Sequence, residues 1–306
     1  MEISIAPSAA SSSYSGTTRI TIIGGQWDHY DPTGLRRLTV CQTHRTVLLN
    51  SGLSGGHFPM SSAHVTATTR EIALVHDPYW DLVPEPLEPT VDPSRTALLI
   101  VDMQYMCAHP EGWMGRLGAD QGKPDHLKER FDFIEEMTPN LKRLLDHARS
   151  TGIEVFHIRV AFHTRTSRDA NSDMQDRLGG TPLIPLDYDI VPALMPLDDE
   201  IVLDKTSVST FNSTSIDQIL RNMGIDRLWI TGVVTEGCVE LTARDARDRG
   251  YHVTLVTDCC ASSSHAAHDD AVQRMTDGQV IRGNLAEELI ARTPPNHGQA
   301  RTTSMA

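Results

Sequence analysis

Three residues whose side chains can cooperate in acyl transfer stand at the ends of apolar runs in this chain. Asp102 ends the run ALLIVD, Lys205 ends IVLDK, and Cys238 comes six residues after the glycine of RLWITG. A cysteine thiolate is a strong nucleophile, a carboxylate can take up and return its proton, and an ammonium group stabilises developing negative charge. Together the three residue types suit the hydrolysis of a C–N or ester bond.

The cysteine also lies at the start of a predicted helix over 235–250, TEGCVELTARDARDRG. The free N–H groups and the dipole at a helix start lower the pKa of a thiol, and a neighbouring lysine lowers it further. The same N–H groups can bind an oxyanion. We therefore expect Cys238 to be an activated nucleophile; a cysteine taken alone would more often be a small buried hydrophobic residue.

The elements that must position these residues alternate regularly from residue 95 onward. Apolar strand-like runs cover 95–104, 153–162, 201–204, 227–233, 252–260 and 279–282, and amphipathic helical stretches cover 129–152, 215–224, 235–250, 265–278 and 284–292. Strands that are apolar on both faces belong to a parallel sheet covered by helices on both sides. The sequence predicts a three-layer α/β/α fold with a mostly parallel central sheet, in which ligands bind beyond the carboxyl ends of the strands.

The two ends of the chain differ from this middle part. We expect residues 1–92 to form an N-terminal extension with a disordered Ser/Ala-rich start, a small β-rich segment containing RITIIGG and TVLLN, and a Pro-rich linker. Residues 93–292 would be the hydrolase domain, and 293–306 a flexible tail. The sequence does not indicate what the extension does.

Composition limits the partners and the compartment. A formal net charge of −13 argues against a nucleic-acid or anionic-membrane surface and leaves a small-molecule substrate. Five cysteines without a C-x-x-C pair favour neither a disulfide framework nor a structural zinc site. The chain shows no apolar run of membrane-spanning length and no secretory signal, so we expect a cytoplasmic protein.

The ordered motifs ALLIVDMQ, DKTSVSTF, GVVTEGCV and TARDARDRGY resemble the isochorismatase-like cysteine hydrolase superfamily over about residues 93–292. The resemblance implies a Rossmann-like fold with Asp102 as acid/base, Lys205 as the catalytic lysine and Cys238 as the nucleophile. It also implies a cis peptide bond between Val233 and Val234. The backbone N–H groups of Val234 and Cys238 would then form the oxyanion hole.

Departures from that family's patterns narrow the expected chemistry. Cys238 argues for amide chemistry, because members that cleave the vinyl ether isochorismate have another residue at the nucleophile position. The segment HTRTSRDANSD lacks the Asp/His metal pattern of nicotinamidases, so we predict no metal and no cofactor and interpret His163 and Asp169 as solvated loop residues. The stretch PEPLEPTVDPS before the first strand resembles the corresponding segment of ureidoacrylate and biuret hydrolases more than that of nicotinamidases. This resemblance favours ureido substrates.

Further residues are candidates for the substrate pocket. They are Gln104, His109, Trp113, Arg159, His163, Phe211 and Glu236. Arg159 or Arg165 could bind a substrate carboxylate through two parallel hydrogen bonds, although an arginine in such a position is more often a solvated side chain. Glu236 could instead cap the helix that follows it.

We therefore predict a cysteine amidohydrolase that cleaves a small amide, carbamoyl or ureido compound through a thioester and releases ammonia or an amine. The alternatives are hydrolysis of an ester or another non-amide bond by the same three residues, and a non-catalytic interaction module with this fold. A redox role for Cys259 and Cys260 is disfavoured, because adjacent cysteines form strained disulfides. We also expect a homo-oligomer, either a dimer or a tetramer.

Overall fold

The computed structural model describes residues 19–21, 48–50, 82, 91–178, 182–277 and 281–293, and the chain divides into two compact units, 1–75 and 76–306. In the first unit, strand β1 (Arg19–Thr21) pairs antiparallel with β2 (Leu48–Asn50). Both strands lie within the predicted runs RITIIGG and TVLLN. The expected disordered start, most of the Pro-rich linker and the tail after residue 293 lie outside the described residues, and the boundary at 92/93 stays a prediction.

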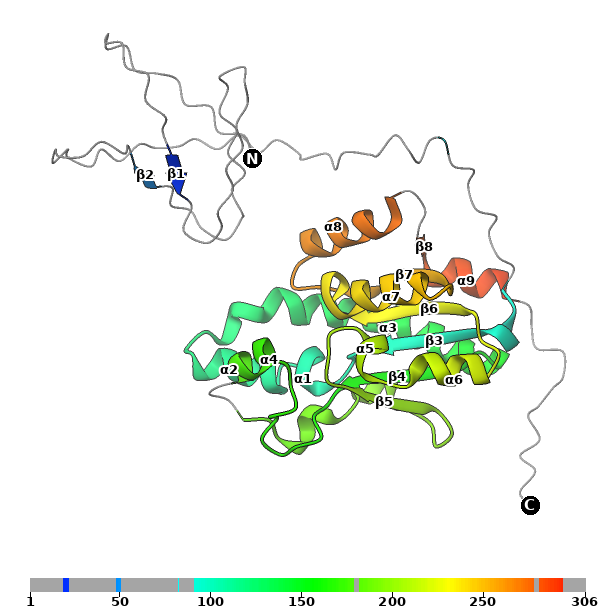
Figure 1. Cartoon of the computed structure of the whole chain (residues 1–306), viewed down its shortest axis with the longest axis horizontal. Helices are drawn as coiled ribbons and strands as arrows, with labels where there is room; N and C mark the ends of the chain where they lie inside the picture. Colours follow the sequence, from blue (N-terminus) through cyan, green and yellow to red (C-terminus); the bar gives the residue numbers. More distant parts are fainter. Residues whose placement is uncertain are drawn as a thin grey trace, which may run out of the picture. The chain divides into compact units, whose positions relative to one another are not determined.

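The second unit is built on a parallel sheet with the strand order β5-β4-β3-β6-β7-β8 (Figure 1). The strands are β3 (Thr96–Val101), β4 (Glu154–Val160), β5 (Ile201–Lys205), β6 (Arg227–Val233), β7 (His252–Ala261) and β8 (Arg282–Asn284). Every neighbouring pair is parallel, so the prediction of a mostly parallel sheet is confirmed and the sheet is wholly parallel. The central strand β3 is buried along its whole length, as a strand covered on both faces must be.

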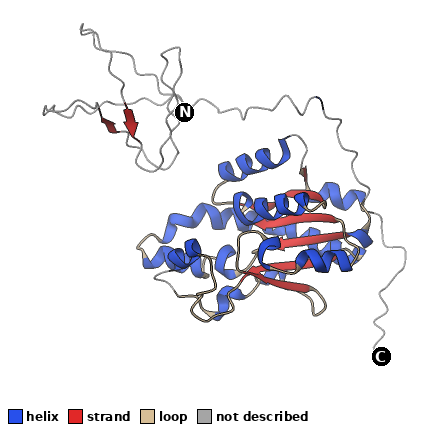
Figure 2. Cartoon of the chain, in the orientation of Figure 1, coloured by secondary structure: helices blue, strands red, loops and turns tan. Residues whose placement is uncertain are grey.

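Helices lie on both faces of the sheet (Figure 2). They are α1 (Tyr105–Ala108), α2 (Trp113–Asp120), α3 (Lys128–Thr151), α4 (Ser172–Leu178), α5 (Thr210–Ser213), α6 (Ile216–Asn222), α7 (Glu240–Asp248), α8 (His265–Thr276) and α9 (Ala286–Arg292), with short 3-10 turns η2 (Pro93–Arg95), η3 (Pro124–Leu127), η4 (Pro185–Tyr188) and η5 (Pro192–Leu194). Leu98 and Ile100 of β3 join the core under α3 and α9. Leu99 and Val101 join the core under α6, α7 and α8, because alternate side chains of a strand point to opposite faces.

The segment that carries the cysteine differs from the single helix predicted over 235–250. It starts as a π-helical turn, η6 (Thr235–Val239), and becomes α-helical only at Glu240. The N–H of Val239 donates to the carbonyl of Val234 over 3.3 Å, which is the i→i−5 bond of a π turn. Apolar periodicity cannot reveal such a turn, because one extra residue shifts the helix face without changing the residue types.

Gly232 allows β6 to pass close to β3 at the carboxyl end of the sheet. Its φ is +107°, and a Cβ built on it would lie 2.0 Å from the carbonyl oxygen of Val101. An L-residue would be strained at this φ and would also collide with backbone that cannot move aside. Since Val101 directly precedes Asp102, this close approach fixes where the Asp102 backbone lies.

Gly232→Ala should therefore destabilise the domain by about 3 kcal/mol or more, because strain and backbone overlap act together. The matched control is Gly224→Ala: φ there is +74°, but nothing lies within 4 Å of the new Cβ. Only the left-handed conformation opposes that change, which should cost about 1–2 kcal/mol. Urea unfolding of the two variants measures the difference, and equal losses would show that the approach to Val101 does not constrain the sheet.

Across the described ranges, no helix combines the length and apolarity that a membrane crossing requires.

Candidate active site

The side chains of Asp102, Lys205 and Cys238 form one cluster at the carboxyl edge of the sheet. Asp102 follows β3, Lys205 is the last residue of β5, and Cys238 lies in η6 after β6. The ammonium Nζ of Lys205 is 3.0 Å from Asp102 Oδ2 and 3.2 Å from Cys238 Sγ. One cation therefore contacts both the carboxylate and the sulfur.

Lys205 is held as a charged, fully bonded ammonium group. It is completely buried, and its third hydrogen bond goes to the carbonyl of Ser207 at 3.2 Å. Burial by itself would lower the pKa of Lys205, but Asp102 and Cys238 together raise it above its ordinary value. An ammonium group has three donors, so all three of its hydrogens are directed and its position is fixed.

Asp102 keeps one oxygen available. Its φ is +55°, in the left-handed region that few residues other than glycine adopt, and its N–H donates to the carbonyl of Ile158 at 2.9 Å. While Oδ2 binds Lys205, the buried Oδ1 has no hydrogen-bond partner among the described residues. A buried carboxylate oxygen without a partner destabilises the folded state. A role as an acceptor during function would explain why it is kept.

The pKa of Cys238 contradicts the expectation from sequence. Burial raises the pKa of the thiol above its ordinary value and the nearby Asp102 carboxylate raises it further, whereas Lys205 opposes this only in part. The predicted lowering of the thiol pKa is wrong first because the thiol is buried, and second because the Asp102 carboxylate opposes the effect of Lys205. Cys238 is therefore a thiol in the resting state. It is only partly buried, whereas Asp102 and Lys205 are buried.

The backbone before Cys238 has an unusual conformation and is anchored to α8. The peptide bond between Val233 and Val234 is cis. Thr235 is buried, and its Oγ1 lies 2.8 Å from Nδ1 of His268 in α8. This contact connects the beginning of η6 to α8. The backbone N–H groups of Val234 and Cys238 therefore belong to a turn that is anchored to a neighbouring helix.

Two residues predicted for the pocket act as structural clamps. The Gln104 amide is buried; its Nε2 donates to the carbonyls of Val160 and Asp187, and its Oε1 accepts from the N–H of Val160. Arg159 binds Asp204 at 2.8 Å and donates to the carbonyl of Tyr188. Most of the hydrogen-bonding groups of both side chains are therefore bound to the protein itself.

The other pocket candidates differ in their burial and in their hydrogen bonds. Trp113 and Phe211 are buried in the two opposite cores. His109 is half-buried, and its Nδ1 accepts from the N–H of Glu111. Glu236 stays near the cysteine within η6 and accepts hydrogen bonds from the hydroxyls of Ser262 and Ser263.

Hydrogen bonds within the loop after β4 hold it together. His163 and Arg165 are exposed, and Asp169 accepts from the backbone N–H groups of His163 and Thr164. Within the ranges that the structure describes, no group of three or more His, Cys, Asp or Glu side chains could hold a metal ion.

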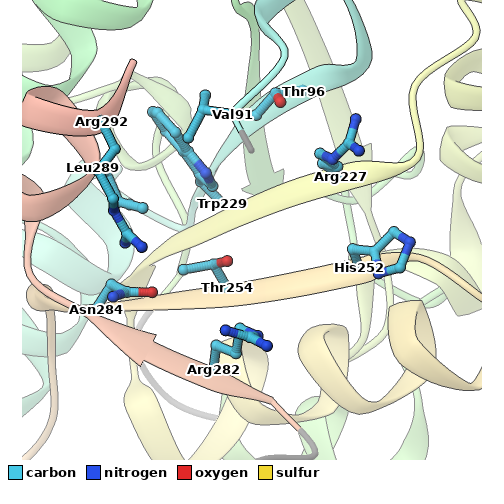
Figure 3. A pocket seen from close by; sticks show the side chains of 10 residues that line it. All are labelled: Val91, Thr96, Arg227, Trp229, His252, Thr254, Arg282, Asn284, Leu289 and Arg292. Atoms are coloured by element: carbon cyan, nitrogen blue, oxygen red, sulfur yellow. The ribbon is translucent and has the colours of Figure 1, made fainter. Parts of the chain in front are cut away.

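Two cavities lie away from the cluster. The cavity in Figure 3 has a volume of about 20 Å³ and is lined by the first residues of the strands, among them Thr96, Arg227 and His252. It therefore lies at the opposite edge of the sheet from Asp102. A groove of about 620 Å³ runs between α1, α3 and η5 past His109, and it too contains none of the three clustered residues.

One charged residue near the cluster was missed in the sequence. Arg130 is only 6% exposed and lies on the buried side of α3 with Ile134, Met137 and Leu141. A charge inside an apolar stripe of spacing 4, 3 and 4 was the signal that could have identified it.

Comparisons with known proteins agree with this architecture. Residues 96–284 match the isochorismatase domain family. The ureidoacrylate amidohydrolase RutB of Caulobacter vibrioides is 30% identical over 210 residues, which cover 62% of this chain and 85% of that protein. The uncharacterized isochorismatase family protein YwoC of Bacillus subtilis is 27% identical over 201 residues, which cover 65% of this chain and 95% of that protein.

Two solved structures are also similar. A cysteine hydrolase from Pseudomonas syringae pv. phaseolicola has a TM-score of 0.57 at 24% identity, covers 69% of this chain and is itself covered to 98%; this likeness shows the fold. An isochorismatase family protein from Desulfovibrio vulgaris has a TM-score of 0.54 at 28% identity, with coverages of 64% and 96%. Since the family match spans more than half of the sequence, this chain belongs to the isochorismatase family and is a hydrolase of that family.

Proposed function

We propose that the chain is a cysteine amidohydrolase that cleaves a C–N bond of a small amide, carbamoyl or ureido compound. The observation that carries the proposal is the contact of one ammonium, Lys205 Nζ, with both Asp102 Oδ2 and Cys238 Sγ. A nucleophile and a proton acceptor that both contact one fixed positive charge are parts that acyl transfer requires.

The first half-reaction forms a thioester. Asp102 takes the proton of the Cys238 thiol as the sulfur attacks the carbonyl carbon, and Lys205 stabilises the charge that passes through the sulfur. The N–H groups of Val234 and Cys238 would bind the oxyanion of the tetrahedral intermediate. When the intermediate collapses, the C–N bond breaks and Asp102 returns the proton to the leaving nitrogen, so ammonia or an amine departs.

The second half-reaction restores the enzyme. Asp102, ionised again, accepts a proton from a water molecule that attacks the thioester carbonyl. The C–S bond then breaks, the carboxylic or carbamic acid leaves, and the proton on Asp102 returns to the sulfur. One residue thus serves as base and as acid in turn, which the free oxygen of Asp102 and its bond to Lys205 support.

A relative supports the C–N bond over an ester, because a protein at 30% identity is named a ureidoacrylate amidohydrolase. The cysteine itself argues only against cleavage of a vinyl ether, since thiolates also cleave esters. An amide is the harder bond because its nitrogen must be protonated as it leaves, and a proton held on Asp102 next to the reacting atoms meets that need.

Cys238→Ala should abolish ammonia release from a panel of small amides, ureas and carbamoyl acids, lowering kcat/KM by about 10⁴-fold or more because the nucleophile is lost. Cys259→Ala is the matched control, since this buried thiol lies in β7 and contacts Asp258 rather than the cluster. Ammonia is assayed with and without a chelator for both variants. Release that survives in Cys238→Ala, or that the chelator stops in the wild type, would contradict the metal-free cysteine mechanism; ester turnover without amide turnover would favour the ester alternative.

Asp102→Asn should separate thiol reactivity from catalysis. In the wild type the pKa of Cys238 is raised, so alkylation of this thiol should increase with pH across the neutral range without reaching a plateau below pH 7. Removing the carboxylate charge leaves the charge of Lys205 uncompensated, which favours the thiolate and should shift the alkylation curve to lower pH. Hydrolysis should nevertheless fall by about 10²-fold or more, because the base is gone.

Iodoacetamide labelling followed by peptide mapping measures the alkylation rate of Cys238 against pH in the wild type and in Asp102→Asn. The buried thiols of Cys107 and Cys260 are the internal references. A wild-type plateau below pH 7 would show that the resting enzyme already holds a thiolate. An Asp102→Asn curve at higher pH than the wild type would show that Asp102 does not suppress ionisation of the sulfur.

A further inference from the structure

Arg130 is a buried cation without a carboxylate partner. It lies in the first turn of α3 and is 6% exposed. Its Nε and Nη2 both donate to one acceptor, the backbone carbonyl of Cys107, at 3.1 and 2.8 Å. No carboxylate lies within ion-pair distance of it among the described residues. A guanidinium has five donors, so both hydrogens of Nη1 and one of Nη2 stay without a bond to the described part of the chain.

Other arginines that are partly buried in this domain are paired differently. Arg116 binds Asp187 with two parallel hydrogen bonds, Arg149 binds Glu200, and Arg159 binds Asp204. Those are the ordinary arrangements for a charge removed from water, because an unpaired buried charge costs several kcal/mol. Arg130 is more deeply buried than these three and departs from the arrangement.

The position of Arg130 is next to the catalytic cluster. Cys107, which it holds, lies in α1 directly after the strand end that carries Asp102. One turn further along α3, the ring of Phe133 meets the ring of His268 edge-on at 5.3 Å, and His268 binds Thr235 of the cysteine turn. The beginning of α3 thus lies between α1 and the turn that holds Cys238.

The electrostatic surroundings agree with this placement. Burial lowers the pKa of Arg130, while the negative forms of Cys107, Glu236, Cys238 and Asp102 oppose the lowering. Three of those four groups belong to the cluster or to its turn, although none of them makes an ion pair with the guanidinium. The side chain stays protonated at any ordinary pH, as arginine does in proteins.

We propose that Arg130 binds a carboxylate of the substrate beside Cys238, so that the preferred substrates are amide, carbamoyl or ureido acids rather than neutral amides. The inference rests on the proposed function. The unused edge of the guanidinium, formed by Nη1 and Nη2, has the planar fork that binds both oxygens of a carboxylate. Arg130 takes the role that the sequence had suggested for Arg159 or Arg165, which the structure pairs with Asp204 or leaves exposed.

Matched acid and neutral substrates test the proposal. N-carbamoylglycine is compared with N-isobutylurea, and succinamate with 4-methylpentanamide, because each pair differs mainly in a carboxylate replaced by an isopropyl group. The wild type should prefer both acids. Arg130→Met should lower kcat/KM for the acids by about 10- to 100-fold, as expected for loss of a charge-assisted pair, and change it less than about twofold for the neutral compounds. Arg130→Lys should recover part of the acid preference.

Control measurements separate this role from a structural one. Arg159→Met should keep the acid preference, since that guanidinium is occupied by Asp204. Thermal melting checks that each variant folds. Should Arg130→Met fail to fold, Arg130→Lys, which keeps the charge but not the planar fork, takes its place and should lower kcat/KM more for the acids than for the neutral compounds. Equal loss on acids and neutral compounds, or a wild type without acid preference, would overturn the proposal.

A binding experiment keeps this inference distinct from the proposed function. Calorimetry with Cys238→Ala should show N-carbamoylglycine binding that weakens about 10- to 100-fold when Arg130→Met is added. If the wild type hydrolysed none of the compounds and this weakening were still seen, the proposed function would fail and the carboxylate site would stand. Binding unaffected by Arg130→Met would overturn the carboxylate site, whatever the activity.

Discussion

The buried ion pair between Lys205 and Asp102 is the interaction on which the rest of the structure depends. Two opposite charges removed from water are tolerated only where their geometry is close and their remaining donors and acceptors are used. Here the 3.0 Å contact, the bond to Ser207 and the contact to Cys238 use every donor of the ammonium. Of the atoms of this pair, an oxygen of Asp102 has no partner in the described part of the chain, at the place where we propose that a proton is accepted.

Several structural features serve to hold this pair in place. Gly232 lets β6 approach β3 at Val101, the residue before Asp102. The π turn that follows β6 contains Cys238, whose sulfur contacts the same ammonium group as Asp102. Gln104 binds both backbone groups of Val160, so the end of β4 is fixed between the strands that carry Asp102 and Lys205. A residue that looked like a pocket candidate is therefore part of the frame.

The sequence predicted the fold because its signals are regular. Apolar runs and amphipathic stretches alternate, and a parallel arrangement brings strand ends to one edge, which is why Asp102, Lys205 and Cys238 could be placed together from their positions alone. The homo-oligomer and the cytoplasmic location stay predictions. The sequence also placed the cysteine at a helix start, but not in a π turn, since an extra residue in a turn leaves no compositional mark.

Properties that depend on packing were not predictable in the same way. The thiol pKa was expected to fall because of the lysine and the helix start, but burial of the thiol and the charge of Asp102 raise it. Arg159 and Arg165 were candidates for binding a substrate carboxylate, and the structure pairs Arg159 with Asp204. Arg130, which we propose for that role, is buried and has no carboxylate partner among the described residues. Such pairing becomes visible only when side chains from distant segments are assembled.

In the proposed reaction Cys238 becomes acylated, Asp102 accepts and returns the proton, and Lys205 stabilises the negative charge. The most direct measurement is rapid acid quenching during turnover of the best substrate, followed by mass spectrometry of the peptides. We expect the peptide that contains Cys238 to gain the mass of the acyl or carbamoyl group together with release of the first equivalent of ammonia. The adduct should be removed by hydroxylamine. Ammonia release with no adduct under conditions that trap thioesters, or an adduct on another residue, would contradict the proposed reaction.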